Sequence, residues 1–201
     1  LSLVIDVTPP TLSITATNGT DTIQNNGFVN QNYLLFTFSM SEPTSDFIAS
    51  NVLVQGGTVS DFTAISSQVY TAKVTAKGNL PISVSVLAES FTDEVGFKNT
   101  TPSQFNWTYD SVAPLIKAIS LSANNDSLKV SINSPLFRKT DGTGNLDSTS
   151  FSLSLSGGIT KLTNNQPVSI AKTGINYNEH IISSNTASGY KNLLTADMND
   201  D

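Results

Sequence analysis

Few side chains in this sequence could carry out acid–base or nucleophilic catalysis. The chain has one histidine, His180, and no cysteine. A nucleophilic Ser or Thr needs a base to activate it, and no elbow such as Gly-x-Ser-x-Gly surrounds His180. The sequence also lacks the His and Cys spacing of a zinc site and the glycine-rich loop of a phosphate site. These features predict a chain that is not an enzyme.

Carboxylates offer a different chemistry, which is the binding of a hard cation. Five acidic side chains lie beside predicted turns, and they are Asp6, Glu42, Asp46, Asp93 and Glu94. Calcium requires several oxygen ligands that converge from different loops. Acidic residues in turns also cap backbone N–H groups, so turn capping is the alternative interpretation of the same pattern. The residues alone leave both interpretations open.

Strands must position these carboxylates, and the first half of the sequence carries strand signals at the spacing of a sandwich. Apolar and polar residues alternate in short runs, as in strands with one buried face. The predicted strands cover residues 12–16, 33–38, 51–55, 59–65, 69–76, 82–88 and 104–109. About seven strands in about 100 residues is typical of an immunoglobulin-type sandwich.

This topology predicts where the five carboxylates lie. In such a sandwich the segment that enters the domain, the loop after the second strand and the loop after the sixth strand share one pole. Asp6 belongs to the entering segment, Glu42 and Asp46 to the first loop, and Asp93 and Glu94 to the second. We therefore expect all five at the junction with a preceding repeat, where clustered like charges repel unless a cation or hydrogen bonds offset them.

Internal similarity indicates a second unit. The segment Val4-Ile5-Asp6-Val7-Thr8-Pro9-Pro10 returns as Thr108-Tyr109-Asp110-Ser111-Val112-Ala113-Pro114. Self-similarity at a fixed period is the signature of a repeat array. The predicted division is residues 1–5 as the last strand of a preceding repeat, 6–110 as a first domain and 111–201 as a second domain.

The second domain is predicted to be incomplete at its C-terminal end. Its predicted strands are 115–121, 128–132, 151–155, 159–163, 168–170, 175–182 and 190–195. Residues 197–201 are predicted to form the turn that precedes a missing last strand. The acidic residues at corresponding places in this unit are Asp110, Asp141, Asp147, Asp200 and Asp201.

The composition excludes several classes of partner. The net charge is −6 without a cluster of Lys or Arg, which disfavours nucleic acid and anionic membranes. No apolar run approaches the roughly 20 residues that span a bilayer, so no membrane insertion is expected in this segment. Only 13% of residues are charged, and Ser, Thr and Asn supply the polar surface, as suits strands and turns.

Several short motifs follow one another in order between Asp6 and Pro114. They are Phe36-Thr37-Phe38-Ser39, Ser41-Glu42-Pro43, Gly56-Gly57-Thr58-Val59, Phe91-Thr92-Asp93-Glu94-Val95-Gly96 and Trp107-Thr108-Tyr109-Asp110. Together they resemble the bacterial immunoglobulin-like repeats of large cell-surface proteins and adhesins. The second half is similar to a sister type of repeat, with Ser134-Pro135 in place of Ser41-Glu42-Pro43. The resemblance implies an extracellular place, at the bacterial cell surface, with an export signal outside this sequence.

The expected fold is all-β, with tandem immunoglobulin-like β-sandwiches of about seven strands each. The expected function is a non-catalytic stalk or spacer of a large secreted or surface-anchored bacterial protein, in adhesion or biofilm-type contacts. The expected partners are neighbouring repeats of the same chain and a surface glycan or protein. No cofactor is required, and structural Ca²⁺ is the one ion expected. The alternative is a carbohydrate-binding or accessory module of a secreted multidomain enzyme, with Phe105 and Trp107 as a stacking platform.

Overall fold

The computed structural model describes residues 6–123, 127–133, 136, 144–156, 165–173, 179–183 and 193–198. The chain divides into two compact units, and the boundary between them falls after Ser111. The regular elements of the described residues are strands and two 3₁₀ turns, without an α-helix, so the predicted all-β fold is confirmed. Residues 1–5 and 159–163, two of the predicted strands, lie outside the described part.

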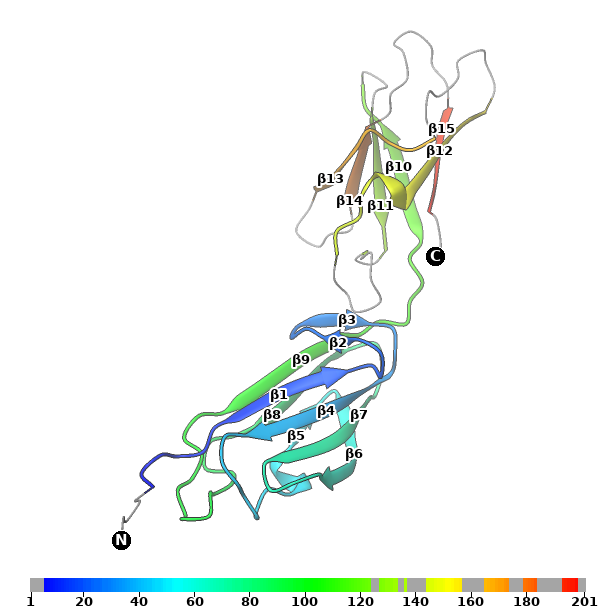
Figure 1. Cartoon of the computed structure of the whole chain (residues 1–201). Helices are drawn as coiled ribbons and strands as arrows, with labels where there is room; N and C mark the ends of the chain where they lie inside the picture. The colour runs from blue at the N-terminus through cyan, green and yellow to red at the C-terminus, as the bar shows by residue number, and fades with distance from the viewer. Residues whose placement is uncertain are drawn as a thin grey trace. The chain divides into compact units, whose positions relative to one another are not determined.

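One face of the first unit is a five-stranded antiparallel sheet in the order β2-β1-β4-β7-β6 (Figure 1). Its strands are β1 (Leu12–Thr17), β2 (Thr22–Ile23), β4 (Tyr33–Met40), β6 (Gly57–Ala64) and β7 (Val69–Ala76). The alternation that predicts β4 reflects burial, because Leu34, Phe36, Phe38 and Met40 are buried and the residues between them are not. At the edge, β6 has a register shift between Ser60 and Thr63.

The other face is a four-stranded sheet in the order β3-β9-β8-β5. Its strands are β3 (Gly27–Val29), β5 (Leu53–Gln55), β8 (Pro81–Val86) and β9 (Ser103–Tyr109). The pairing of β3 with β9 is parallel, and the other two pairings are antiparallel. The other seven strands of the first unit correspond to predicted strands, whereas the sequence predicts no strand at β2 or β3, which have two and three residues.

Aromatic side chains from both sheets fill the space between them. Phe36 of β4 meets Phe105 of β9 edge to face, with ring centroids 5.5 Å apart. Phe47 lies 5.1 Å from Tyr70 and 5.6 Å from Phe91, again edge to face. Such pairs add to the stabilisation from apolar burial.

Phe105 and Trp107 belong to this core, with 5% and 1% of their surfaces exposed. Side chains that are buried in this way cannot stack on a sugar. The idea that they form a carbohydrate-stacking platform is therefore wrong, because the inward face of β9 is the apolar face.

Gly56 lets the chain cross from β5 in one sheet to β6 in the other. Its φ is +74°, a conformation that only glycine adopts without strain. A Cβ at this position would also lie 2.5 Å from the carbonyl oxygen of Pro81. Gly56 is thus a sheet-crossing point at which no side chain fits.

The second unit has a four-stranded sheet in the order β10-β11-β14-β13 and a separate pair, β12 and β15. The strands are β10 (Ile116–Leu121), β11 (Ser127–Ile132), β12 (Phe151–Ser156), β13 (Ser169–Thr173), β14 (Glu179–Ser183) and β15 (Leu193–Met198). Leu128, Val130, Ile132 and Phe151 form its buried cluster. His180 lies in β14, opposite Val130.

The predicted turn at residues 197–201 is wrong at its start. Asp197 and Met198 belong to β15, where they pair with Ser152 and Phe151 of β12. The polar composition at the end of the sequence indicates a turn, but the antiparallel register with β12 extends the strand as far as Met198.

Candidate metal site

Three of the five predicted carboxylates meet at one pole of the first unit. Asp6, Glu42 and Asp93 each offer a carboxylate oxygen, and these oxygens lie within 4.8 Å of one another. The residues come from three separate segments: residues 6–11, which we call the N-terminal segment, residues 41–52, the β4–β5 loop, and residues 87–102, the β8–β9 loop. The cluster exists only because the sandwich brings these segments together.

Asp93 is held by a tight turn of its own loop. Its Oδ1 accepts hydrogen bonds from the backbone N–H groups of Val95, Gly96 and Phe97, at 2.9, 2.7 and 2.9 Å. Gly96 has a φ of +98°, which allows the chain to curl around the carboxylate. Converging N–H groups of this kind form a small anion-binding hollow, so the orientation of Asp93 is fixed by backbone.

The second oxygen of the same carboxylate has a different environment. Asp93 is 6% exposed, and its Oδ2 is buried without a hydrogen-bond partner. Buried polar atoms are nearly always paired, and an unpaired one costs about 1–3 kcal/mol. Oδ2 is therefore the oxygen of Asp93 that is left for a ligand.

Thr8 lies between the other two carboxylates. Its backbone N–H donates to Asp6 Oδ1 at 3.0 Å, and its hydroxyl is 2.8 Å from the same oxygen and 3.2 Å from Glu42 Oε1. The N–H and then the hydroxyl of Thr8 lower the pKa of Asp6 from its ordinary value. A hydroxyl has one proton, so it can donate to only one of the two carboxylates at a time.

Asp46 is not part of this cluster, and its oxygens accept hydrogen bonds from other residues. It accepts from the N–H and hydroxyl of Thr92, both at 2.9 Å, and from the hydroxyl of Thr44 at 2.8 Å. Desolvation raises the pKa of Asp46, but these hydrogen bonds outweigh it, and the net pKa is lowered. For Asp46 the geometry matches the capping interpretation.

Glu94 is also outside the cluster. It lies on the turn after Asp93 and its side chain is exposed. The structure therefore brings together three of the five predicted residues and not the other two.

The β4–β5 loop is anchored to the core on both sides of Asp46. The hydroxyl of Tyr70 donates to the carbonyl of Thr44 at 2.9 Å, and Phe47 is buried. A 3₁₀ turn, η1 (Ala49–Asn51), follows, and the amide of Asn51 donates to the carbonyl of Ser90 in the β8–β9 loop at 2.9 Å. The burial of Tyr70, and then the charge of Asp46, raise the pKa of the phenol.

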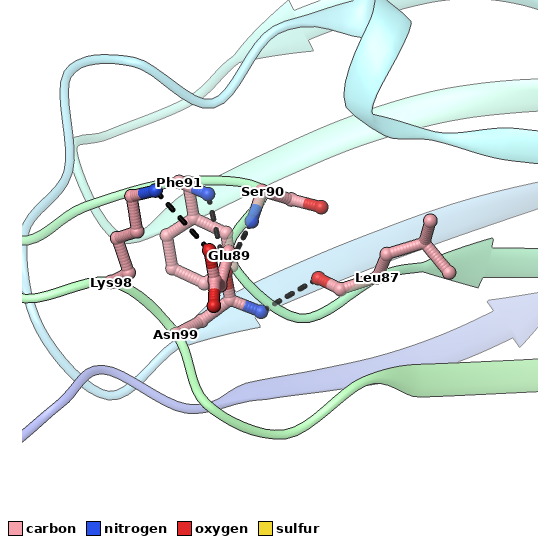
Figure 2. A network of polar contacts seen from close by, with 6 residues as sticks. All are labelled: Leu87, Glu89, Ser90, Phe91, Lys98 and Asn99. Atoms are coloured by element: carbon pink, nitrogen blue, oxygen red, sulfur yellow. Dashed lines mark hydrogen bonds and ion pairs between the residues drawn. The ribbon is translucent and has the colours of Figure 1, made fainter.

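The β8–β9 loop is held from inside by Asn99, which is fully buried (Figure 2). Its side-chain oxygen accepts from the N–H groups of Ser90 and Phe91 at 2.7 and 3.2 Å. Its amide donates to the carbonyls of Leu87 and Thr101 at 2.8 and 3.3 Å. All four hydrogen-bonding positions of the amide are satisfied, so this side chain replaces a missing stretch of ladder.

Two residues of this pole had no role in the sequence-based interpretation. For Asn99, nothing in one sequence distinguishes a buried amide from an exposed one. Thr8 follows Asp6 at a spacing of two residues, which is the spacing of a local side-chain turn, and this signal could have identified it.

Two of the acidic residues predicted at corresponding places of the second repeat, Asp110 and Asp147, are described. Asp147 caps the 3₁₀ turn η2 (Ser148–Ser150), because its side chain accepts from the N–H of Thr149 at 2.9 Å. Asp110 follows the end of β9 in the first unit, and its backbone N–H donates to the carbonyl oxygen of Val29 in β3. Asp141, Asp200 and Asp201 lie outside the described residues.

The outer face of the sheet with β8 and β9 has a shallow groove with a volume of about 470 Å³. Its lining combines the polar residues Asn26, Gln55, Ser83, Asn106 and Thr108 with the apolar residues Phe28, Pro81, Ile82 and Trp107. The volume falls in the range of small-ligand sites.

Comparison with known proteins gives one match. A family model described as a bacterial Ig-like domain matches residues 6–109, which span the first unit from the first clustered carboxylate to the end of β9. No curated protein and no solved structure matches the chain significantly. Within the described residues, no helix has the length and apolar character to cross a membrane.

Proposed function

We propose, from the premise that the chain belongs to the bacterial Ig-like domain family, that it is a non-catalytic stalk or spacer segment. The protein that contains it would be large and either secreted or anchored at the bacterial surface. In this role the chain extends the reach of other parts of that protein in adhesion or biofilm-type contacts. Its main partners are the neighbouring domains of the same chain.

The observation that carries this proposal is that the chain enters and leaves the first unit at opposite poles (Figure 1). At the N-terminal pole, the N–H of Thr11 donates to the hydroxyl oxygen of Ser41 at 2.9 Å. At the other pole, the N–H of Asp110 donates to the carbonyl of Val29, and the hydroxyl of Ser111 donates to Asn79 at 2.9 Å. A domain with this path can be joined in series without a connection that doubles back.

The strand pairing suits a segment under tension. A force applied between the two poles acts along β1 and β9, so it shears the β1–β4 and β3–β9 ladders. Shear loads all the hydrogen bonds of a ladder together, whereas peeling breaks them one after another. A unit loaded through its poles is therefore expected to resist unfolding.

Force spectroscopy tests this expectation directly. The chain has no cysteine, so attachment points can be introduced in pairs. Val7→Cys with Val112→Cys loads the first unit from pole to pole, and both positions are exposed. Gly78→Cys with Val112→Cys instead peels β8 from β9, starting at the pair Pro81 and Thr108. We expect a clearly higher unfolding force for the first pair, and an equal or lower force would count against the spacer role.

The carbohydrate-binding alternative has one observation in its favour, which is the groove that Phe28 and several polar side chains line. A glycan array probed with the whole chain separates the two functions. The spacer proposal expects no saturable binding. Strong binding to one polysaccharide, abolished by Asn106→Ala in the groove, would favour the alternative.

A further inference from the structure

The N-terminal pole carries most of the exposed apolar side chains of the first unit. Among the described residues of this unit, six of the exposed large apolar side chains lie at this pole, and they are Val7, Ile48, Ile65, Leu87, Val95 and Phe97. The remaining three are Leu35, Leu53 and Leu80. Single exposed apolar residues are ordinary, but a group of them at one end of a domain marks an interaction surface.

These six side chains come from four segments that meet at the pole. They are the N-terminal segment, the β4–β5 loop, the β8–β9 loop and residues 65–68, the turn between β6 and β7. The turn belongs to this pole because the carbonyl of Ser67 accepts from the N–H of Thr44 at 2.8 Å, and the side-chain amide of Gln68 donates to the carbonyl of Ser41 at 3.1 Å. The apolar group therefore lies at the end where the chain enters the domain.

We propose that this pole is the docking surface for a preceding Ig-like domain of the same kind as the first unit, which contacts it through the end opposite its own N-terminal pole. The inference rests on the proposed spacer function, and it adds that consecutive domains pack against one another. Linked domains move relative to one another by default unless the interface between them is large and hydrophobic. The six apolar side chains provide a hydrophobic surface of this kind.

The repeated linker identifies the occupant. Residues 108–114, which repeat the pattern of residues 4–10, contain the boundary between the two compact units, after Ser111. The same pattern before β1 therefore indicates a domain on that side as well. Thr8 and Thr11 are hydrogen-bonded to the β4–β5 loop, so such a domain is tethered within a few residues of the pole. A short tether gives a high effective concentration, at which a weak contact is sufficient.

The charge of the pole disfavours a symmetric dimer of two N-terminal poles. Its four segments contain the acidic residues Asp6, Glu42, Asp46, Glu89, Asp93 and Glu94. Their one basic residue is Lys98, which pairs with Glu89. Two such poles placed face to face would repel each other.

The opposite end of the unit is a better complement. It has two acidic residues, Asp21 and Asp110, and the turn between β7 and β8 exposes Lys77 and Leu80. A preceding domain with this kind of end brings a cation and an apolar side chain to an acidic, apolar surface. Contact in series therefore involves much less repulsion than contact between two N-terminal poles.

Thiol labelling tests the docking. The probe is a second copy of residues 6–109, fused through its Tyr109 to Asp6 of the chain in place of residues 1–5, so that the junction imitates Tyr109-Asp110. The chain has no cysteine, so Val95→Cys in the downstream domain introduces a single reporter, at a position that is 61% exposed. The thiol reacts only while the domains are apart, so a joint that is docked about nine-tenths of the time slows labelling about tenfold relative to the chain without the added copy.

Matched variants locate the contact. Leu35→Cys, on the outer face of β4, should label at the same rate with and without the added copy. Ile48→Ser with Ile65→Ser in the downstream domain should restore fast labelling of Val95→Cys, because both replace exposed side chains of the pole. Leu35→Ser with Leu53→Ser, which are exposed elsewhere, should leave the labelling slow.

Three results would overturn the proposal. One is an equal labelling rate of Val95→Cys with and without the added copy, and another is slow labelling that survives Ile48→Ser with Ile65→Ser. The third is protection of Val95→Cys that appears in the chain alone as its concentration rises, which would indicate a symmetric dimer. Fast labelling with a high pole-to-pole unfolding force would reject docking but leave the spacer function, whereas a low force would reject the spacer function itself.

Discussion

The carboxylate of Asp46 accepts both the backbone N–H and the hydroxyl of Thr92, and so it joins the β4–β5 loop to the β8–β9 loop. Thr92 is followed directly by Asp93. By holding Thr92, Asp46 also positions Asp93, whose Oδ2 has no hydrogen-bond partner. One acidic residue of this pole is used for structure and the next is left available.

Asp46→Ala should lower the free energy of unfolding of the first unit by about 1 kcal/mol. Hydrogen bonds to a charged group contribute about 1.5–3 kcal/mol, and we reduce this value because Asp46 is exposed and screened by solvent. Urea unfolding followed by Trp107 fluorescence measures the change. Glu94→Ala is the matched control and should leave the midpoint unchanged, and equal effects of the two variants would contradict the capping role.

Acid should weaken the first unit through Asp46. Its pKa is lowered in the folded state from an ordinary value of 3.8, so its contribution to stability is present above that value. The contribution is lost as the pH falls through the lower, folded pKa. Below about pH 4, the stability of the parent chain should therefore fall more steeply than that of Asp46→Asn. Parallel curves for the two proteins over this range would show that Asp46 is not responsible.

Asn99→Ala should destabilise the first unit by about 3 kcal/mol, since each buried group left without a partner costs about 1–3 kcal/mol. The substitution leaves two N–H groups and two carbonyls of the β8–β9 loop unpaired. Thermal unfolding measures the loss. Lys98→Ala is the control in the same loop, because it removes only the exposed ion pair of Lys98 with Glu89, and its effect should stay below about 1 kcal/mol.

Gly56→Ala should destabilise the first unit by at least about 1–2 kcal/mol. The strained backbone conformation alone costs about that much, and the collision of the new Cβ with the backbone adds to it. The new Cβ would lie 2.5 Å from the carbonyl oxygen of Pro81. Gly78→Ala is the comparison, since a Cβ there meets nothing within 4 Å. It should be neutral or slightly stabilising, because alanine reduces the freedom of the unfolded chain. Similar losses at both positions would refute this account of Gly56.

The strands of the first unit could be predicted because burial on one face imposes a period of two. The prediction of residues 33–38 corresponds to β4 at Tyr33–Met40, and that of 104–109 corresponds to β9 at Ser103–Tyr109. The short strands β2 and β3 carry no such period, and they form because β1 and β9 offer partners. In the second unit the same dependence on a partner, β12, makes Asp197 a strand residue.

The place of the acidic cluster could also be predicted, because it follows from topology. The use of each carboxylate could not, because a capping side chain and a free one differ only in the donors around them. Thr92 provides those donors for Asp46, and the turn at Val95–Phe97 provides them for one oxygen of Asp93. Those contacts depend on the folded loops and leave no trace in residue spacing.

The register shift in β6 has a consequence for how two β-rich units fold on one chain. Units joined in this way are at high effective concentration, and an exposed, regular edge strand can pair with the wrong unit. In the first unit the edge β6 is interrupted between Ser60 and Thr63, with Asp61 at a φ of +53°, and the edges β2, β3 and β5 are three residues or shorter. Bulged and short edges offer a poor template for strand addition, so the first unit is guided to complete its sheets from its own residues.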